Sequence, residues 1–459
     1  MGGDISTYID AHQPQHLARV QAFVRQPSVS ADGTGVAAMA DLVAQTIREV
    51  GGTAERWPTA GHPVVYGRLD AGARRTLLFY GMYDVQPVEG EEWSVPPFAG
   101  EVLEVPGHGP CLVARGAANQ KGPLAGFCNV LAAFRALGAP PPVNIVFLIE
   151  GEEELGSRHL PEAVRTHRDA LRADAAFFGA YGQDARGIPA VYLGVKGIIF
   201  MELVCHGGAW GGPQTRMIHG SNAAWIGSPP WRLLQALVSM MGRDEQILID
   251  GFYDEVAPPD ADEERLYERL AEVFDAQTVL RQHDVRRFKL EGQGETLLRN
   301  YLGLPTLNID GLTAGWMGPG SKTVLPHEAR ARVDIRLVPA MSIERTLARL
   351  RAHLRAQGLD DVEVDVWQAY PWAQTPWRAS VVQALLQAIR DQGLEPYAWP
   401  RIAGSAPMYL FSQVLGLPFV MGGLGHGGRQ HGPNEYARLE GMRLYERSVA
   451  AFLQRFAST

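Results

Sequence analysis

Carboxylate side chains are concentrated in one short segment of the chain, Glu150-Gly151-Glu152-Glu153-Glu154-Leu155-Gly156-Ser157. This segment directly follows the apolar run 143–149, which has the composition of a buried strand. Grouped carboxylates suit metal binding or proton transfer to a substrate. The alternative is a solvated acidic helix start, because the helix dipole favours negative charge there. The segment alone does not choose between the two.

Strand-like and helix-like segments alternate in the first 150 residues. Strands are expected at 64–69, 76–80 and 143–149, and helices at 17–24, 36–50 and 123–137. The alternation predicts an α/β domain with a mixed, mostly parallel sheet flanked by helices. Met82-Tyr83-Asp84 follow the second strand as the acidic segment follows the third. Because ligands bind outside the carboxyl ends of strands in such sheets, we expect the site there.

The pattern changes near residue 198, which predicts a second, smaller domain inserted into the first. We expect the α/β domain to comprise residues 1–197 and 373–459, and an inserted α+β lid or dimerisation domain to comprise 198–372. Its strands are expected at 198–204, 306–309 and 331–338, its helices at 231–241 and 343–357, and an acidic linker around 260–264.

Composition narrows the range of partners. With 459 residues, 46% of them hydrophobic, the chain can bury a large core. A net charge of −8 supplies no basic field for phosphate backbones or anionic lipid, so we expect no nucleic acid or membrane partner and a small-molecule substrate instead. Three cysteines form no disulfide framework, residues 1–10 do not read as a signal peptide, and no apolar run is long enough to span a bilayer. These features predict a cytoplasmic protein.

Several further segments occur in a recognisable order and spacing. They are Tyr80–Pro87, Trp93–Phe98, Arg115–Gly122 and His431–Glu435, and in the insert Cys205–Gly208, Pro305–Gly311, Lys322–Pro326 and Arg336–Pro339. Together with the acidic segment they resemble the co-catalytic zinc peptidases and deacylases, a family that includes carnosinase, glutamate-releasing carboxypeptidases, aminoacylase and succinyl-diaminopimelate desuccinylase. The resemblance spans nearly the whole chain, and the segments of the insert look most like the carnosinase branch.

The resemblance implies a particular chemistry. In that family two zinc ions share a bridging Asp and a water molecule, each metal also takes a His and a carboxylate, and an adjacent Glu removes the proton of the water. Zinc lowers the pKa of bound water and polarises the scissile carbonyl. Carried over, Glu153 falls on the general base, Glu154 on a metal carboxylate and His431 on the terminal His ligand.

Other positions depart from the family pattern. Met82 stands where the family has its first His ligand, although Asp84, which would orient that His, is retained. Asn119 stands at the bridging Asp, followed by Gln120 in place of a second acid. A thioether is a poor zinc ligand, and a neutral amide cannot supply the charge that holds two dications together. We expect Met82 and Asn119 to face the substrate instead.

The remaining Asp ligand of the family aligns with Ala180, unless a shifted alignment brings Asp184 there. With so few ligands retained, we predict that the two-zinc centre is absent and that no cofactor is needed. Glu154 and His431 would hold at most one weakly bound zinc or manganese ion.

The substrate-binding positions of the family are retained. By the resemblance, His206, Thr323 and Arg336 bind the free carboxylate of the substrate and stabilise developing negative charge, and Gly404 and Ser405 lie in the loop beside it. His206 and Thr323 would reach across from the partner subunit of a homodimer. The planar guanidinium of Arg suits bidentate binding of a carboxylate.

Three functions are compatible with this pattern. The first is an enzyme that hydrolyses, transfers or forms an amide bond of a small carboxylate-bearing amide or amino-acid-like substrate, without the two-zinc centre. In it, Glu153 is the acid/base, Asp84 supports the site and His206 stabilises charge. The second is a non-catalytic ligand-binding protein that kept the fold, and the third is a dipeptidase with a single unconventional metal.

Overall fold

The protein is described here by a computed structural model that covers residues 4–290 and 292–459. It divides into two compact units: unit 1 comprises Met1–Gly194, Gln374–Arg401 and Ala406–Thr459, and unit 2 comprises Val195–Ala373 and Ile402–Ser405. The chain passes between them in β9 (Gly194–Val195) and β16 (Ala373–Gln374). Residues 402–405, assigned from the sequence to the α/β domain, group with unit 2 instead, where the backbone N–H of Lys196 donates to the carbonyl of Gly404.

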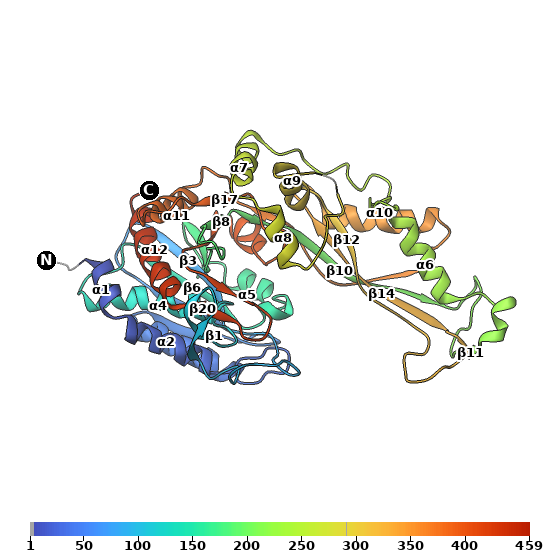
Figure 1. Ribbon diagram of the computed structural model, residues 1–459, viewed down its shortest axis with the longest axis horizontal. Coiled ribbons are helices and arrows are strands. Elements are labelled where there is room, and N and C mark those ends of the chain that lie inside the picture. Colours follow the sequence, from blue (N-terminus) through green and yellow to red (C-terminus); the bar gives the residue numbers. More distant parts are fainter. Residues whose placement is uncertain (1–3, 291) are drawn as a thin grey trace. The chain divides into compact units, whose positions relative to one another are not determined.

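Unit 1 is built on an eight-stranded mixed sheet in the order β1-β2-β6-β3-β7-β18-β8-β17 (Figure 1). The strands are β1 (Thr53–Trp57), β2 (Val64–Leu69), β3 (Thr76–Met82), β6 (Asn144–Glu150), β7 (Ala175–Gly179), β8 (Ala190–Tyr192), β17 (Tyr397–Trp399) and β18 (Phe419–Gly422). The central strands β6, β3, β7 and β18 are parallel, whereas β1 and β2 extend the edge antiparallel. The predicted α/β class with a mixed sheet is confirmed.

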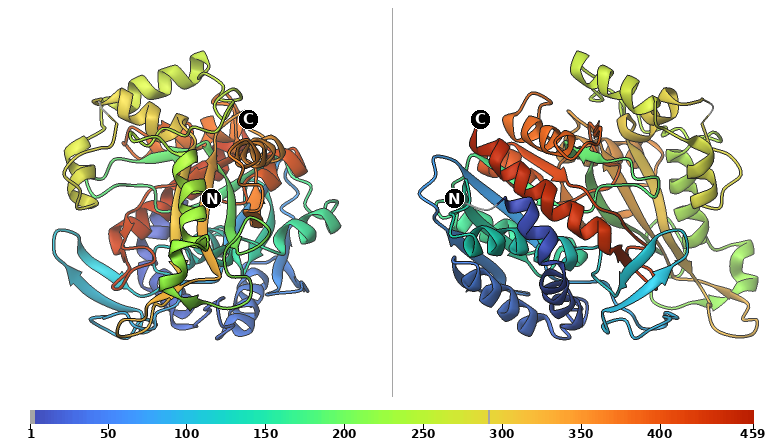
Figure 2. Two further views of the ribbon diagram at one scale, coloured as in Figure 1. Left: turned by 90° about the vertical axis from the view of Figure 1, so that its right-hand side faces the viewer. Right: turned by 60° about the vertical axis from the view of Figure 1, so that its left-hand side comes forward.

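Helices cover the sheet of unit 1 (Figure 2). They are α1 (Ile5–Ala11), α2 (Gln13–Arg25), α3 (Val36–Glu49), α4 (Lys121–Ala136), α5 (Leu160–Thr166), α11 (Ser380–Arg390) and α12 (Leu439–Ala457), with short turns η1 (Glu153–Leu155) and η3 (Leu410–Leu415). Successive residues of β3 point to opposite faces: Phe79 stacks on Phe127 of α4 at 3.8 Å, and Tyr80 contacts Phe411 of η3. Burial on both faces explains why these strands are almost wholly apolar.

A small antiparallel sheet in unit 1 has the order β19-β20-β5-β4. Its strands are β4 (Glu101–Val105), β5 (Gly109–Val113), β19 (Gly427–Gly428) and β20 (Tyr436–Arg438). Cys111, Val113 and Tyr436 form its buried core. This sheet anchors both ends of the loop that carries His431.

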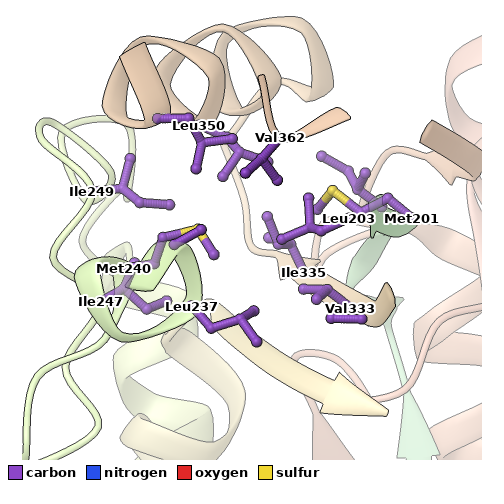
Figure 3. Close-up of a cluster of buried hydrophobic side chains, with 14 of the residues drawn as sticks. Met201, Leu203, Leu237, Met240, Ile247, Ile249, Val333, Ile335, Leu350 and Val362 are labelled. Atoms are coloured by element: carbon purple, nitrogen blue, oxygen red, sulfur yellow. The ribbon is translucent and has the colours of Figure 1, made fainter. Parts of the chain in front are cut away.

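Unit 2 has a four-stranded antiparallel sheet in the order β12-β14-β10-β15. The strands of this sheet are β10 (Gly197–His206), β12 (Thr306–Ala314), β14 (Glu328–Leu337) and β15 (Glu363–Tyr370). Unit 2 also contains the strand pair β11 (Ile218–His219) and β13 (Val324–Leu325) and the turn η2 (Gly220–Ala224). Its helices are α6 (Pro229–Met240), α7 (Ala261–Ala271), α8 (Ala276–Gln282), α9 (Glu295–Gly303) and α10 (Ile343–Ala356). Figure 3 shows side chains of α6, such as Leu237 and Met240, converging on Leu203 and Ile335 of the sheet. This buried cluster is the core of unit 2.

The prediction of an acidic linker around 260–264 is wrong, because these residues begin helix α7. The Asp260 side chain caps the helix by accepting from the backbone N–H groups of Asp262 and Glu263. Acidic residues in a first helical turn are stabilised by the helix dipole, so the charge that suggested a linker is a helix start signal.

Within the described ranges, no helix combines the length and the apolar character needed to cross a bilayer.

Candidate functional site

The polar segments of unit 1 meet at one edge of its main sheet. Met82, the last residue of β3, lies beside Glu150, the last residue of the parallel strand β6. The chain therefore leaves both strands at the same edge, and the segments 82–86 and 150–157 are neighbours. Met82 is buried, with 1% of its surface exposed, so its thioether is not presented to solvent as that of a substrate-facing side chain would be.

Asp84 supports the turn that carries the acidic residues. Its two carboxylate oxygens accept from the backbone N–H groups of Glu153 at 3.2 Å and Glu154 at 3.1 Å. Burial raises the pKa of Asp84 to about 7, the nearby charge of Glu154 adds to the rise, and the two backbone hydrogen bonds partly offset it. The resemblance implies that Asp84 would orient a His ligand. In the structure, Asp84 fixes the position of η1.

Glu153, the predicted acid/base, carries a carboxyl group without a partner among the described residues. In the described part of the chain its carboxyl group has no hydrogen-bond or ion-pair partner, although the residue is only partly exposed. Burial raises its pKa well above the ordinary value, and the nearby charges of Glu154, Glu150 and Asp84 add to the rise. A protonated carboxyl group without a partner can donate its proton to a substrate atom and take one back.

Glu154, Asn119 and His431 form one compact polar group, in which Nε2 of His431 either donates to Glu154 or accepts from Asn119. The Nδ2 of Asn119 lies 2.8 Å from Oε1 of Glu154 and 3.1 Å from Nε2 of His431, and Nε2 of His431 lies 3.2 Å from Oε2 of Glu154. Nε2 of Gln86 donates to the same Oε2 at 2.8 Å. The hydrogen bond with Glu154 raises the pKa of His431. Both oxygens of Glu154 are therefore occupied by side-chain donors.

This donor set does not fit the pair of zinc ions that the family resemblance implies. The amide nitrogen of Asn119 lies between Glu154 and His431 and points hydrogen-bond donors at the atoms that would bind metal. Met82 offers only a buried thioether, and Ala180 offers no ligand atom. Across residues 4–290 and 292–459, no cluster of three or more His, Cys, Asp or Glu side chains is arranged to hold a metal ion.

Asp184, the alternative to Ala180, is engaged in its own turn. Its carboxylate pairs with Arg186 at 2.8 Å and accepts from the backbone N–H groups of Arg186 and Ile188. Ala180 continues from β7, where its N–H donates to the carbonyl of Gly422. A shifted alignment therefore does not bring an acid into the site.

A buried ion pair joins the two loops that carry Asn119 and His431. Glu435 accepts from the backbone N–H groups of Gly116, Ala118 and Asn119, at 3.1, 2.9 and 2.8 Å, and pairs with Arg115 at 3.1 Å. Arg115 also donates to the carbonyl of Gly432. Sequence reasoning gave these two residues no role, although both lie in the motifs that carry the resemblance.

In unit 2, Arg336 and Ser405 are in direct contact. Nη1 of Arg336 donates to Oγ of Ser405 at 2.8 Å, and its Nε donates to Asp334 at 2.8 Å. Ser405 in turn donates to the carbonyl of Gly197. These contacts hold the guanidinium group in one orientation, with Gly404 in the adjoining loop.

His206 lies at the other end of the same sheet, and Thr323 precedes β13 of the separate strand pair β11-β13. In the register of β10 and β14, His206 is opposite Glu328 and Ile198 is opposite Arg336. At about 3.3 Å per residue, this separation along the strand is about 26 Å. His206 lies 3.6 Å from the carboxylate of Glu328, and the carbonyl of Thr323 accepts from Gly220. One chain therefore cannot bring His206 and Arg336 to the same carboxylate.

The fold and the acidic turn at the carboxyl ends of its strands define a two-unit α/β peptidase type. The chain belongs to the peptidase family M20/M25/M40, whose match covers residues 78–455.

Solved structures and curated proteins agree with this assignment. An M20 family metallo-carboxypeptidase from Sulfolobus solfataricus is similar with a TM-score of 0.88 and 31% identity, over 97% of this chain and 99% of that one. Human carnosine dipeptidase 1 is similar with a TM-score of 0.82 and 25% identity, over 99% of this chain and 98% of that one. The Cys-Gly metallodipeptidase DUG1 of Saccharomyces cerevisiae is 26% identical, over 98% of this chain and 97% of that protein.

Proposed function

We propose that this protein acts on the amide C–N bond of a small, carboxylate-bearing, dipeptide-like substrate without the two-zinc centre of its relatives. Membership of the peptidase family and the dipeptidase names of several relatives support the reaction class. The observation that carries the altered mechanism is the position of Asn119, whose Nδ2 contacts both Glu154 and His431.

Glu153 moves the proton in the proposed reaction. Cleavage of an amide requires a proton for the departing amine, and formation or transfer of an amide requires removal of one. The carboxyl group of Glu153 has no partner among the described residues and its pKa is raised well above the ordinary value, so its protonated form can meet the first need and its conjugate base the second. Asp84 keeps this carboxyl group in place through the backbone of η1.

Arg336 binds the free carboxylate of the substrate in this proposal. Its side chain already has two fixed contacts, to Asp334 and Ser405, so little conformational freedom is lost when the guanidinium group meets a carboxylate. A bidentate contact of this kind selects substrates with a terminal carboxylate.

The proposed site is completed in a homodimer by His206 and Thr323 of a second copy. The separation of His206 and Arg336 along one sheet supports this arrangement. Helix α6 also exposes Trp231 and Val238, seven residues apart and therefore on one face, with 69% and 70% of their surface accessible. Large apolar side chains exposed together are typical of protein interfaces.

Two measurements on the full-length protein test the proposal. The first is the zinc and manganese content of unchelated protein by plasma mass spectrometry, before and after incubation with excess metal. The second is turnover of a dipeptide panel, with and without a chelator, by wild type and Glu153→Gln, with the exposed Glu162→Gln as the matched control. We expect well under one metal ion per chain, chelator-resistant turnover, and a loss of turnover of at least about 100-fold only in Glu153→Gln.

Other outcomes assign other functions. About two zinc ions per chain would overturn the altered mechanism and return the protein to the chemistry of its relatives. Activity abolished by a chelator and restored by one metal would indicate a single-metal dipeptidase. Saturable binding of dipeptides without turnover would indicate a non-catalytic ligand-binding protein.

A further inference from the structure

A second group of basic side chains surrounds Tyr436 in unit 1, beside the small sheet. Tyr436 and Arg438 lie two residues apart on β20 and so share a face, while His426 precedes β19 and His108 lies in the turn between β4 and β5. The rings of His108 and His426 stack at 5.1 Å, and the ring of His108 lies 5.0 Å from that of Tyr436. The mechanism proposed above uses none of these residues.

The positive charge in this group is not balanced. Neither Arg438 nor the exposed Arg429 forms an ion pair or a side-chain hydrogen bond with any residue that the structure describes. The pKa of His108 is lowered first by burial, and the positive charges of Arg438 and Arg429 also lower it. Like charges held together without a counter-ion repel one another, and this repulsion favours binding of an anion.

Two hydrogen-bonding atoms in the group are buried and have no partner. They are Nδ1 of His108 and Nε of Arg438. Buried polar atoms in proteins are nearly always satisfied by the protein, by water or by a ligand, so two such atoms in one charged group require an explanation.

The hydrogen bonds of His426 fix which of its ring nitrogens carries the proton. Its Nδ1 lies 2.8 Å from the carbonyl oxygen of Gln183, which can only accept, so the proton of the neutral ring is on Nδ1. Its Nε2 therefore accepts from the hydroxyl of Tyr436 at 3.1 Å. With those groups satisfied, the free groups are Nδ1 of His108 and the guanidinium groups of Arg438 and Arg429, which suit an acceptor with several oxygens.

We propose that His108, Arg438 and Arg429 form a binding site for a small oxyanion, a phosphate or a carboxylate. Arg438 supplies the charge and a directed donor, His108 supplies a neutral donor, and Arg429 lies at the solvent side. The ligand is either a free anion or an acidic group of a larger molecule. The site is independent of the function proposed above, because it uses no residue of either predicted site.

Isothermal titration calorimetry with inorganic phosphate and with glutarate tests this site. The full-length protein is used at low ionic strength with Arg336→Gln, which removes the carboxylate-binding arginine of unit 2 from the measurement. We expect saturable binding of at least one of the two anions, with one ion per chain. Adding Arg438→Gln should weaken it about tenfold or more, because a charge-assisted hydrogen bond is lost.

The matched control is Arg74→Gln, which removes an equally unpaired, exposed arginine from a turn outside the small sheet. It should leave the affinity unchanged. If Arg438→Gln does not fold, as judged by circular dichroism, His108→Gln replaces it with the same expected direction. Absence of saturable binding of either anion, or equal weakening by the Arg438 and Arg74 substitutions, would overturn the proposal. If the protein binds an anion, the one that binds more tightly identifies the ligand as phosphate or as an organic acid.

Discussion

At the scale of single residues, the character of the site depends on whether residue 119 is an acceptor or a donor. A carboxylate at this position would bring a third negative group next to Glu154. The amide of Asn119 instead donates to Glu154 and lies 3.1 Å from Nε2 of His431, so hydrogen bonds offset the negative charge of the carboxylate. An amide at this position is consistent with the other departures from the family pattern that the resemblance implies, at Met82 and Ala180.

Asn119→Asp tests this view of the site. Without metal, the new carboxylate should repel Glu154 and lose the donor to His431, and we expect the free energy of unfolding to fall by roughly 1–3 kcal/mol. Added zinc should restore part of this loss in the variant and leave wild type unchanged. The measurement is urea denaturation with and without zinc, and a variant as stable as wild type in the absence of metal would contradict the interpretation.

Glu150 makes stability depend on pH. It is buried, its Oε1 accepts from Tyr80 and Ser157, and its Oε2 has no partner. Burial raises its pKa from 4.5 to about 8. Between these values the folded chain keeps a proton that the unfolded chain releases, so this group's contribution to stability decreases as the pH rises through that range.

Glu150→Gln should remove this dependence, because the amide oxygen can accept the same two hydrogen bonds at every pH. Near pH 5 we expect the variant to match wild type within about 1 kcal/mol, and above pH 8 to be more stable by roughly 1–3 kcal/mol. The measurement is chemical denaturation across this pH range. Parallel stability curves for the two proteins would show that Glu150 is ionised in the folded state.

At the scale of elements, the loops that carry Asn119 and His431 are joined by Glu435. Glu435→Gln should destabilise the protein by roughly 2–4 kcal/mol, because an amide cannot accept from three backbone N–H groups and leaves Arg115 with one partner fewer. Glu440→Gln is the control: its ion pair with Arg443 is exposed, and its loss should cost under about 1 kcal/mol. Equal effects in thermal denaturation would contradict the role given to Glu435.

Most elements follow from local patterns, and the exceptions have physical causes. The expected strand at 64–69 is β2, and the expected strand at 143–149 differs from β6 by one residue at each end. Both are buried, so their apolar runs identify them. The strand expected at 306–309 continues to Ala314, because β12 is a largely exposed edge strand whose polar residues give no such signal.

The site was predictable only as far as the motifs identify positions. The meeting of Glu154, Asn119 and His431 follows from the resemblance. The contacts of Gln86 and Glu435 do not, because they join residues 68 and 316 positions apart in the chain. Such contacts depend on how the loops leave different strands, and short-range patterns hold no information on this.

At the scale of the whole molecule, the proposed carboxylate site of unit 2 needs a second copy to bring His206 to Arg336. His206 and Arg336 lie at opposite ends of one antiparallel sheet, and a rigid sheet cannot shorten the distance between them. In a twofold dimer, each site would take Arg336 from one chain and His206 from the other.

Subunit complementation tests this arrangement. His206→Ala and Arg336→Ala should each abolish binding of a carboxylate-bearing dipeptide at the predicted site. The two variants are unfolded, combined in equal amounts and refolded. Half of the dimers should then contain one chain of each variant, and each such dimer has one intact and one doubly altered site. About a quarter of the wild-type number of dipeptide sites should therefore return, measured by equilibrium dialysis. The control is each variant unfolded and refolded alone. Because the proposed site takes His206 from one chain and Arg336 from the other, no recovery of binding in the mixed sample would contradict it.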